Sequence, residues 1–257
     1  MSTESNGNSQ GAAHHYEEAS EVPSNIRKYW QQRHSIWSKY DEGILMTDDA
    51  WFGVTPEPVA MKIAEHLAKI LPPEKTVLID AFAGVGGNSI AFALSGRFKQ
   101  IFAIEKDAEV IKCAKHNAGI YGVKNKIFFV KGDCFESLPQ NYKKTGQNAV
   151  IFASPPWGGP GYTEDAIFNL STMEPYSLEY QFTNFSNISS HIALFLPRTS
   201  NLNQLARFAQ GENKVQVMHY CMKGASKALC VYYGDFKILN EAQEEEEEET
   251  MLEAPEG

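Results

Sequence analysis

The sequence has few cysteines, and their spacing excludes several kinds of site. Four occur among 257 residues and no two lie two positions apart, so the paired spacing of a zinc ribbon is missing. We therefore expect reduced thiols in an intracellular protein rather than a disulfide framework. The seven histidines show no metal-ligand spacing either, and no metal is expected. The cysteines are Cys113, Cys134, Cys221 and Cys230.

Long apolar runs are also absent. No stretch approaches the roughly 20 apolar residues of a membrane helix, so no membrane partner is expected. The first twenty residues, MSTESNGNSQGAAHHYEEAS, have neither the basic start nor the apolar centre of a secretory signal. No repeat with a period of 20–50 residues is present, so nothing indicates a solenoid or a propeller.

Positive charge is missing from both ends of the chain. Residues 241–257 hold nine glutamates and no lysine or arginine, and residues 1–26 hold four glutamates and likewise no lysine or arginine. The whole chain carries −9, so residues 27–240 carry +4. This mildly basic body permits a phosphate-bearing substrate without requiring one.

Composition divides the chain into four segments. Residues 1–23 are polar and rich in serine, asparagine and glycine, which predicts a disordered tail. Residues 24–73 predict a small helical cap, and residues 74–240 predict the main domain. The glutamate-rich residues 241–257 predict a second disordered tail. Helices of the cap are expected over residues 24–44 and 55–71.

The main domain alternates strand patterns with helix patterns, which predicts an α/β fold with a mostly parallel sheet covered on both faces. The last two strands are joined by the short KGASK and must be antiparallel. Seven strands with a final hairpin resemble the Rossmann-like sheet of class I S-adenosylmethionine-dependent methyltransferases. Strands are expected over residues 76–83, 100–107, 126–133, 148–156, 191–197, 214–222 and 228–236, and a helix over residues 108–121.

A glycine-rich turn, DAFAGVGGNS, follows the first of these strands. Gly84 and Gly86 let the chain approach a ligand closely at the carboxyl edge of the sheet. Ser89 stands where the dinucleotide pattern G-x-G-x-x-G needs its third glycine. NAD therefore fits less well than S-adenosylmethionine, and no partner for hydride transfer is evident.

Three carboxylates stand at the ends of consecutive predicted strands, where open α/β sheets bind ligands. Glu105 can hold both hydroxyls of an adenosine ribose. Asp133 can accept a hydrogen bond from the adenine amine, and Asp80 can pair with the amino group of a methionine moiety. The alternative for Glu105 is a solvated strand end that pairs within its own segment, EKD.

The fourth strand ends in Ser154-Pro155-Pro156-Trp157 at the same edge. This segment resembles the (Asn/Asp/Ser)-Pro-Pro-aromatic motif of methyltransferases that act on exocyclic amino groups of bases. Such an amine is a poor nucleophile because its lone pair is delocalised into the ring. A rigid turn can aim the nitrogen at the methyl carbon, and the aromatic ring can stack on the base. The alternative is a turn that merely closes the end of the sheet.

Four segments together resemble the trimethylguanosine synthases, a family of RNA cap hypermethylases: KYWQQRHSIWSKYDEGI, AWFGVTPEPVAMKIAEHLA, DAFAGVGGNSIAFAL and SPPWGGPGY. The resemblance covers roughly residues 24–237. It implies methylation of the exocyclic N2 of 7-methylguanosine caps on small nuclear and nucleolar RNAs, giving the 2,2,7-trimethyl cap and S-adenosyl-L-homocysteine. It also implies a nuclear and nucleolar protein, with a cytoplasmic pool, that meets ribonucleoprotein proteins. We expect a monomer.

The resemblance implies roles for individual residues. Trp157 stacks on the 7-methylguanine, whose positive ring adds a cation–π attraction on the order of 1–2 kcal/mol. Ser154 and Pro155 hold the N2 amine. The cofactor-binding residues are Trp37, Thr55, Asp80, Gly84, Gly86, Asn88, Glu105, Asp133 and Cys134. Lys28, Tyr162 and Arg198 contact the cap phosphates.

Several of these residues also have plain structural interpretations. Asn88 can cap the following helix. Lys28 and Arg198 can be ordinary surface charges, and Tyr162 can be a packing residue. Two further tryptophans, Trp30 and Trp51, are expected in the core of the cap.

Two rival functions stay open. One is an amino-methyltransferase for internal guanine or adenine of RNA or DNA, which usually has a broader basic surface. The other is a catalytically silent cap-binding protein, which would not need a glycine turn with Glu105 and Asp133.

Overall fold

The structure is a computed structural model that describes residues 11–158, 166–209, 215–222 and 225–238. Tyr162 and the expected acidic tail at residues 241–257 lie outside the described residues, as do residues 1–10 of the expected N-terminal tail.

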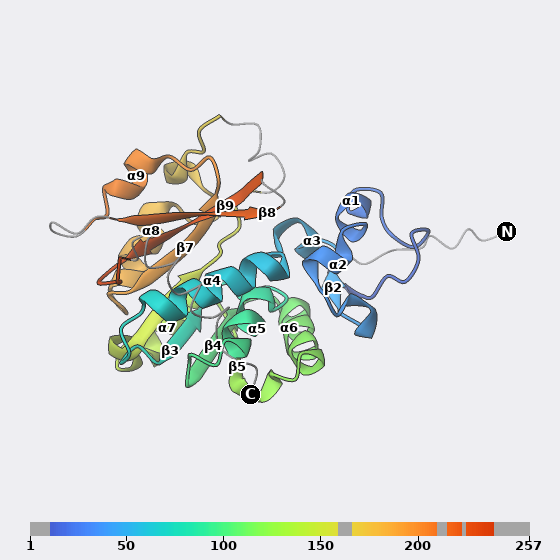
Figure 1. Cartoon of the computed structure of the whole chain (residues 1–257), viewed down its shortest axis with the longest axis horizontal. Coiled ribbons are helices and arrows are strands. Elements are labelled where there is room, and N and C mark those ends of the chain that lie inside the picture. The colour runs from blue at the N-terminus through green and yellow to red at the C-terminus, as the bar shows by residue number, and fades with distance from the viewer. Residues whose placement is uncertain (1–10, 159–165, 210–214, 223–224, 239–257) are drawn as a thin grey trace, which may run out of the picture.

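Seven strands form one mixed sheet in the spatial order β5-β4-β3-β6-β7-β9-β8 (Figure 1). Strands β3 to β7 are parallel, and β9 is antiparallel to both of its neighbours. The predicted α/β sheet with a final antiparallel hairpin is confirmed. The strands are β3 Val77–Asp80, β4 Gln100–Glu105, β5 Ile127–Lys131, β6 Ala149–Ala153, β7 Ile192–Pro197, β8 Gln216–Met222 and β9 Ala225–Tyr233.

The chain reverses its direction across the sheet between β3 and β6. It moves outward from β3 through β4 to β5, then returns to β6 on the other side of β3. Open α/β sheets bind ligands outside the carboxyl ends of the strands at such a point. Asp80 ends β3 and is the register partner of Phe152, two residues before Ser154. The reversal therefore lies beside Asp80 and Ser154.

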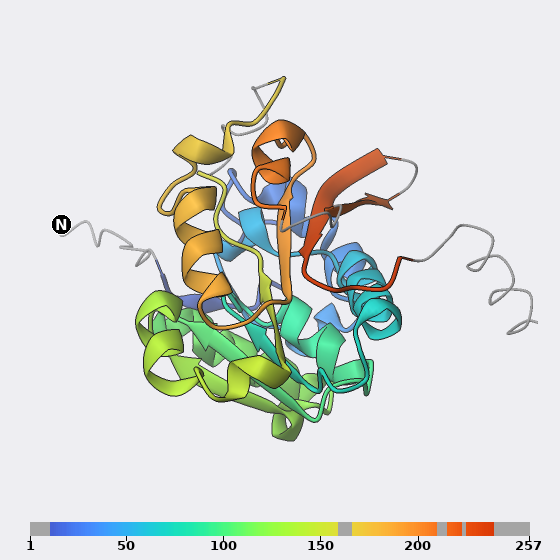
Figure 2. The ribbon, with the colours of Figure 1, turned by 90° about the vertical axis from the view of Figure 1, so that its left-hand side faces the viewer.

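Two apolar layers cover the sheet, because successive side chains of a strand point to opposite faces. Leu78 and Phe152 pack with α4, α5 and α6, whereas Ile79 and Ile151 pack with α7, α8 and α9. Figure 2 shows α4 and α8 on opposite sides of the sheet. The helices are α4 Glu57–Ile70, α5 Gly87–Leu94, α6 Ala108–Ile120, α7 Cys134–Asn141, α8 Leu178–Ser186 and α9 Leu202–Ala206, with short 3-10 turns η2 Lys124–Lys126, η3 Thr145–Asn148 and η5 Leu170–Thr172.

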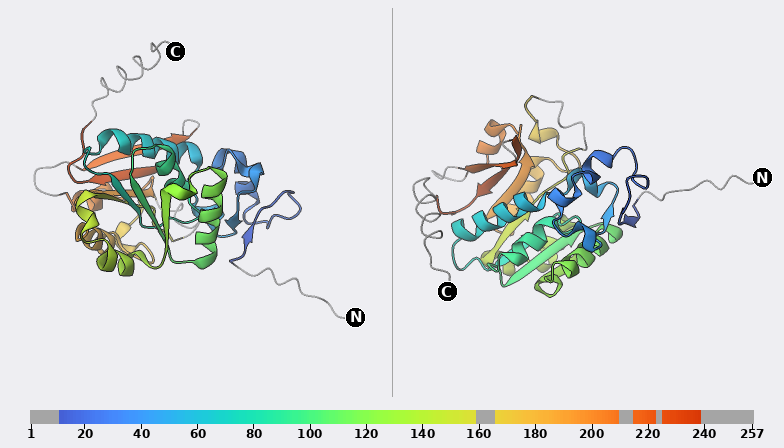
Figure 3. Two further views of the ribbon diagram at one scale, coloured as in Figure 1. Left: turned by 90° about the horizontal axis from the view of Figure 1, so that it is seen from below. Right: turned by 45° about the vertical axis from the view of Figure 1, so that its right-hand side comes forward.

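The cap lies at one end of the sheet domain (Figures 1 and 3). Trp30, Tyr40 and Trp51 are at most 6% exposed and form its aromatic core, as expected for the two tryptophans. None of the helices in the described part of the chain has the length and apolarity to cross a membrane. The elements of the cap are β1 Ala13–His14, α1 Arg27–Trp30, α2 Arg33–Ile36, η1 Tyr40–Glu42, β2 Met46–Thr47 and α3 Ala50–Gly53.

The prediction of a disordered tail is wrong for residues 11–23. Strand β1 pairs with β2, and Tyr16 and Val22 are buried. The Tyr16 hydroxyl donates to Asp48 Oδ1 at 2.7 Å, and the Tyr16 carbonyl accepts from Trp30 Nε1 at 3.0 Å. The polar composition of this segment concealed two apolar side chains that the cap buries.

The single helix predicted over residues 24–44 is also wrong, because the segment forms α1, α2 and η1. Trp37 ends α2 with extended backbone angles, φ −136° and ψ 110°. This break leaves the indole ring beside Gly87, at the start of α5. The cap therefore reaches the glycine turn through a residue that a continuous helix would direct elsewhere.

Candidate active site

The glycine turn is fixed between β3 and the end of β4. Gly84 and Gly86 have φ values of +53° and +97°, which glycine adopts without strain. A Cβ on Gly86 would lie 3.2 Å from the Cα of Ala114 in α6, so the close approach of that helix also favours glycine. The Gly84 N–H donates to Glu105 Oε2 at 3.1 Å. The turn and the β4 carboxylate therefore form one unit.

Glu105 is held at the strand end by two backbone groups. Its Oε2 accepts from Gly84, and its Oε1 accepts from the Asp107 N–H at 2.9 Å. Each carboxylate oxygen keeps a further acceptor site. Glu105 is half-buried, so it is an oriented acceptor pair at the edge rather than a freely solvated strand end.

Asp80 is buried completely beneath the turn. Its Oδ2 accepts from Ser89 Oγ at 2.6 Å, whereas its Oδ1 has no hydrogen-bond partner. Burial raises the pKa of Asp80 to about 7, with a smaller contribution from the nearby Glu105 charge. A buried acceptor without a partner is costly, and a cationic donor that pairs with it would remove that cost.

Asp133 begins α7 as its N-cap, because its Oδ1 accepts from the Phe135 N–H at 2.8 Å. Its Oδ2 accepts from the Tyr176 hydroxyl at 2.6 Å. This hydrogen bond is the largest cause of the raised pKa of Tyr176. The adjacent Cys134 is buried, and burial raises the pKa of its thiol.

Tyr176 is a site residue that sequence reasoning missed. It lies 43 residues from Asp133 in a segment without a motif, so no local pattern could reveal the contact. Its ring meets Phe135 edge-on with centroids 4.6 Å apart and stacks on Tyr180 at 5.4 Å. Phe82, two residues beyond Asp80, lies 6.4 Å from the same ring. An aromatic wall therefore stands beside the Asp133 carboxylate.

The cap contributes Trp37 and Thr55 to the start of α5. Asn88 Nδ2 donates to Thr55 Oγ1 at 3.0 Å, so Asn88 links the turn to the cap rather than capping its own helix. Asn88 Oδ1 and Trp37 Nε1 are buried without partners. Trp37, Thr55 and Gly87 line one crevice together with apolar side chains of α4 and α5.

Trp157 follows β6 on the same edge and is fixed by the neighbouring strand. Its Nε1 donates to the Phe195 carbonyl of β7 at 3.3 Å, and its ring lies 5.8 Å from the Phe195 ring at 43°. Pro155 is buried, whereas Ser154 and Trp157 are half-exposed. The turn is therefore anchored through one proline and one indole N–H, while its polar and aromatic groups reach solvent.

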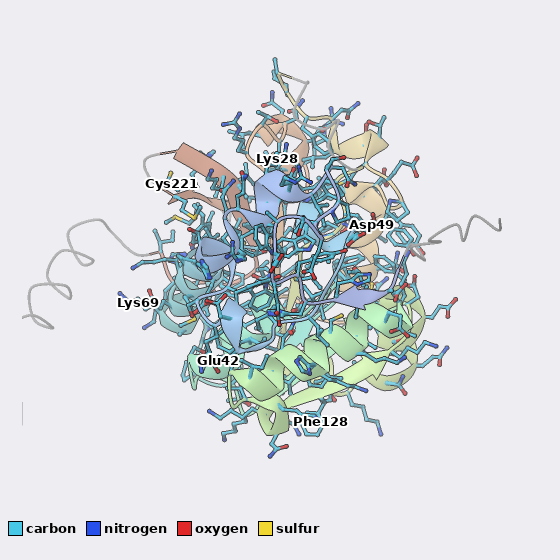
Figure 4. All side chains as sticks on the ribbon, turned by 90° about the vertical axis from the view of Figure 1, so that its right-hand side faces the viewer. Lys28, Glu42, Asp49, Lys69, Phe128 and Cys221 are labelled. Carbon is cyan, nitrogen blue, oxygen red and sulfur yellow. The ribbon has the colours of Figure 1, made fainter. Side chains whose placement is uncertain are left out.

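The two described phosphate-contact candidates lie on different elements. Arg198 is exposed and immediately follows β7, at the edge where Phe195 holds Trp157. Lys28 is exposed on α1 of the cap, with its Nζ 4.8 Å from the Tyr29 ring (Figure 4). The strand register unites Asp80, Glu105, Asp133, Ser154 and Arg198 at one sheet edge. Lys28 lies on the cap and not on a strand end, and Tyr162 lies outside the described residues.

Metal-ligand geometry does not occur in the described ranges, since no three His, Cys, Asp or Glu side chains converge there. Two solved structures share the fold. A methyltransferase from Porphyromonas gingivalis W83 has a TM-score of 0.59 at 16% identity, covering 83% of this chain and 51% of that one. A methyltransferase from Agrobacterium tumefaciens, described as SAM-dependent, has a TM-score of 0.52 at 14% identity, covering 71% and 63%. This chain thus spans less than two thirds of either solved chain.

Sequence comparisons are more specific. A trimethylguanosine synthase from Schizosaccharomyces pombe is 36% identical over 213 residues, covering 82% of this chain and 87% of its own length. A second, from Saccharomyces cerevisiae, is 32% identical over 214 residues, covering 81% and 67%. Residues 75–236 match the RNA cap guanine-N2 methyltransferase family over more than half of the chain. The chain therefore belongs to the RNA cap guanine-N2 methyltransferases, enzymes that depend on S-adenosylmethionine.

Proposed function

We propose that this chain converts 7-methylguanosine caps of small nuclear and nucleolar RNAs to the 2,2,7-trimethyl form. One observation carries the proposal: an indole held by Phe195 stands on the Pro-Pro turn of β6, at the edge that also carries Asp80 and Glu105. Family membership supplies the reacting atom, N2 of the cap guanine. The two yeast relatives are trimethylguanosine synthases, which favours two successive transfers.

The acceptors of the edge fit S-adenosylmethionine. Its amino group is a cation that can satisfy the unpartnered Oδ1 of Asp80. Its ribose hydroxyls can donate to Glu105, whose oxygens are oriented by the turn. Its adenine amine can donate to Asp133 beside Cys134 and the aromatic wall. When bound, the cofactor supplies an electrophilic methyl group.

Trp157 selects and orients the base in this proposal. Its N–H is committed to Phe195, so the ring plane is fixed before the substrate arrives. A 7-methylated guanine carries positive charge, and an indole facing it gains about 1–2 kcal/mol when water is excluded. A neutral guanine lacks this attraction. The enzyme can therefore distinguish 7-methylguanine from guanine without hydrogen bonds to the edge of the base.

The Ser154-Pro155 segment positions the amine. The Ser154 hydroxyl and the backbone carbonyls of the turn can accept the N2 hydrogens, which aims the lone pair at the methyl carbon. Buried Pro155 keeps the turn from yielding. Correct orientation supplies much of such an acceleration. No strong base is required, since the methylated amine becomes acidic after transfer.

Three residues contact the phosphates of the cap in this proposal. Arg198 at the edge, Lys28 on the cap and Tyr162 contact the triphosphate bridge, the first two as cations and Tyr162 as a hydrogen-bond donor. The enzyme acts as a monomer in the nucleus and nucleolus, with a cytoplasmic pool, on ribonucleoprotein-associated RNA. These assignments rest on the resemblance of the motifs.

The decisive test is methyl transfer from labelled S-adenosylmethionine to two capped dinucleotides. We expect incorporation into the 7-methylguanosine cap, located at N2 by mass fragmentation, and little into the unmethylated cap. Trp157→Ala should abolish transfer while leaving affinity for S-adenosylhomocysteine nearly unchanged. Equal use of both caps would remove the charge-selective role of Trp157. Cofactor binding without transfer to either cap would favour an internal base as substrate.

A further inference from the structure

A second surface, away from the catalytic edge, carries an exposed aromatic platform. Phe128 on β5 is 51% exposed, and its ring stacks on Phe102 of β4 with centroids 5.2 Å apart and planes at 26°. Phe102 in turn meets Tyr142 edge-on at 4.9 Å. The exposed ring is thus backed by two others. A rigid ring with one free face is the kind of platform on which bases of single strands stack.

Lysines flank the segments that form this platform. Lys126 immediately precedes β5, and Lys143 and Lys144 follow Tyr142 in the chain. All three are exposed, and within the described part of the chain none forms an ion pair. We call Lys126, Phe128, Lys143 and Lys144 the β5-edge surface. Unpaired lysines beside a stacking ring match the chemistry of a nucleic acid backbone.

The positive charge of the body is concentrated in the same part of the chain. Residues 97–148, which form β4 through η3, contain ten basic and five acidic side chains, a net +5. The whole body, residues 27–240, carries only +4, so the remainder is slightly negative. Glu105 ends β4, and Asp133 and Glu136 stand at the start of α7 beyond the carboxyl end of β5, whereas Phe128 is the second residue of β5. A polyanion is therefore attracted to this edge of the sheet rather than to the body in general.

The platform lies within reach of an RNA whose cap occupies the active site. Three strand spacings separate β5 from β6, about 14 Å across the sheet. Phe128 precedes the carboxyl end of its strand by three residues, about 10 Å along it. Figure 4 shows Phe128 on the outer surface beyond α6. A few extended nucleotides can span these distances.

We propose that the β5-edge surface binds the single-stranded RNA that follows the cap. One base stacks on Phe128, and the three lysines contact backbone phosphates. The proposal rests on the proposed function only for the identity of the substrate, a capped RNA. The surface adds affinity for the RNA chain and leaves the chemistry at N2 unchanged.

The test compares two substrates of one enzyme, a capped dinucleotide and a capped, unstructured RNA of about 20 nucleotides, longer than a typical single-strand site. We expect the combined variant Lys126→Ala, Lys143→Ala, Lys144→Ala to lower kcat/KM for the long RNA about tenfold. The slope of log kcat/KM against log salt should become shallower by about 2, for three lost phosphate contacts. Phe128→Ala should cost at least about fivefold, and Phe128→Tyr should retain activity.

The dinucleotide serves as the internal control for folding and chemistry, and its turnover should stay unchanged in every variant. Lys62→Ala is a matched surface control, because Lys62 pairs with Glu65 on α4, on the other face of the sheet. Equal losses on both substrates, or no loss on either, would overturn the proposal. So would a dimer of the parent protein that the variants dissociate, since a second copy would then occupy the surface. Failure of the parent enzyme on the dinucleotide would instead contradict the proposed function.

Discussion

Buried Asp80 gives the free protein a pH dependence whose sign follows from burial. Its pKa is raised from 3.8 to about 7, so between these values the folded state holds a proton that the unfolded chain releases. The contribution of Asp80 to the free energy of unfolding is therefore fully present below pH 3.8 and is lost as the pH rises through about 7. Asp80→Asn, which cannot ionise, should therefore have a higher Tm than the parent at pH 8 and a smaller difference at pH 5.

The comparison between Asp80→Asn and the parent isolates the titration of Asp80. His66, whose pKa burial lowers to about 4, contributes the opposite slope in both proteins and cancels in the difference. Asp80→Asn should also lower the affinity for S-adenosylhomocysteine, because a neutral amide cannot form an ion pair with the amino group of the ligand. Calorimetric titration at pH 8 measures that affinity. A variant that binds as tightly as the parent would remove Asp80 from the cofactor site.

Tyr176 donates to the carboxylate that we assign to the adenine amine, and this contact carries a prediction of its own. Tyr176→Phe keeps the ring against Phe135 and Tyr180 but removes the hydroxyl that fixes Asp133 Oδ2. We expect affinity for S-adenosylhomocysteine to fall about fivefold, or about 1 kcal/mol, as for the loss of one ordinary hydrogen bond. Affinity for the analogue with a keto group in place of the adenine amine should change little. Parallel losses for both ligands would mean that Tyr176 only supports the fold.

At the scale of elements, a second amide, besides Asn88, joins the cap to the glycine turn. Asn117 of α6 is fully buried; its Oδ1 accepts from the Leu45 N–H at 2.9 Å, and its Nδ2 donates to the carbonyls of Leu45 and Val85 at 3.0 Å. Val85 lies between the two glycines of the turn. The segment that leads into β2 and the glycine turn therefore share the donor and acceptor groups of one buried amide.

Asn117→Ala should cost about 2–4 kcal/mol of stability, since it removes the partners of the buried Val85 carbonyl and of two half-buried groups of Leu45. Asn141→Ala is the control, because Asn141 is exposed on α7 with a single bond to the Ser137 carbonyl. Urea unfolding gives the free-energy difference. Hydrogen exchange should show faster opening of residues 11–54 than of the central strands. Uniform acceleration across the sheet would contradict a local link between cap and turn.

Predictability from sequence also differs between elements. Apolar periodicity predicts the central strands and the helices α4 and α6, because each of these elements buries a regularly spaced set of apolar side chains. The common location of the carboxylates Asp80, Glu105 and Asp133 could be predicted from the ends of the predicted strands, because the carboxyl ends of parallel strands meet at one edge of the sheet. Periodicity could not reveal the break at Trp37, which tertiary packing imposes, or the order of residues 11–23, which depends on two buried side chains. Tyr176 and Asn117 act through contacts distant in sequence, which no local pattern encodes.

At the scale of the whole molecule, charge is divided between a basic body and acidic ends. Residues 27–240 carry +4 with the excess near β5, whereas residues 241–257 carry −9. Removing residues 241–257 changes the net charge from −9 to zero. Like charge repels RNA, so this deletion should raise kcat/KM for a long capped RNA several-fold at low salt.

Salt should screen the repulsion between the acidic tail and the RNA. The advantage of the deletion should vanish near 1 M salt, where the Debye length is about 3 Å, and the capped dinucleotide should respond far less than the long RNA. A variant in which Gln replaces Glu at positions 244–249 keeps the length and removes six of the nine charges. It should recover most of the effect if charge is the cause. A deletion effect that persists at high salt, or that the Gln variant does not reproduce, would assign the tail a role other than electrostatic repulsion.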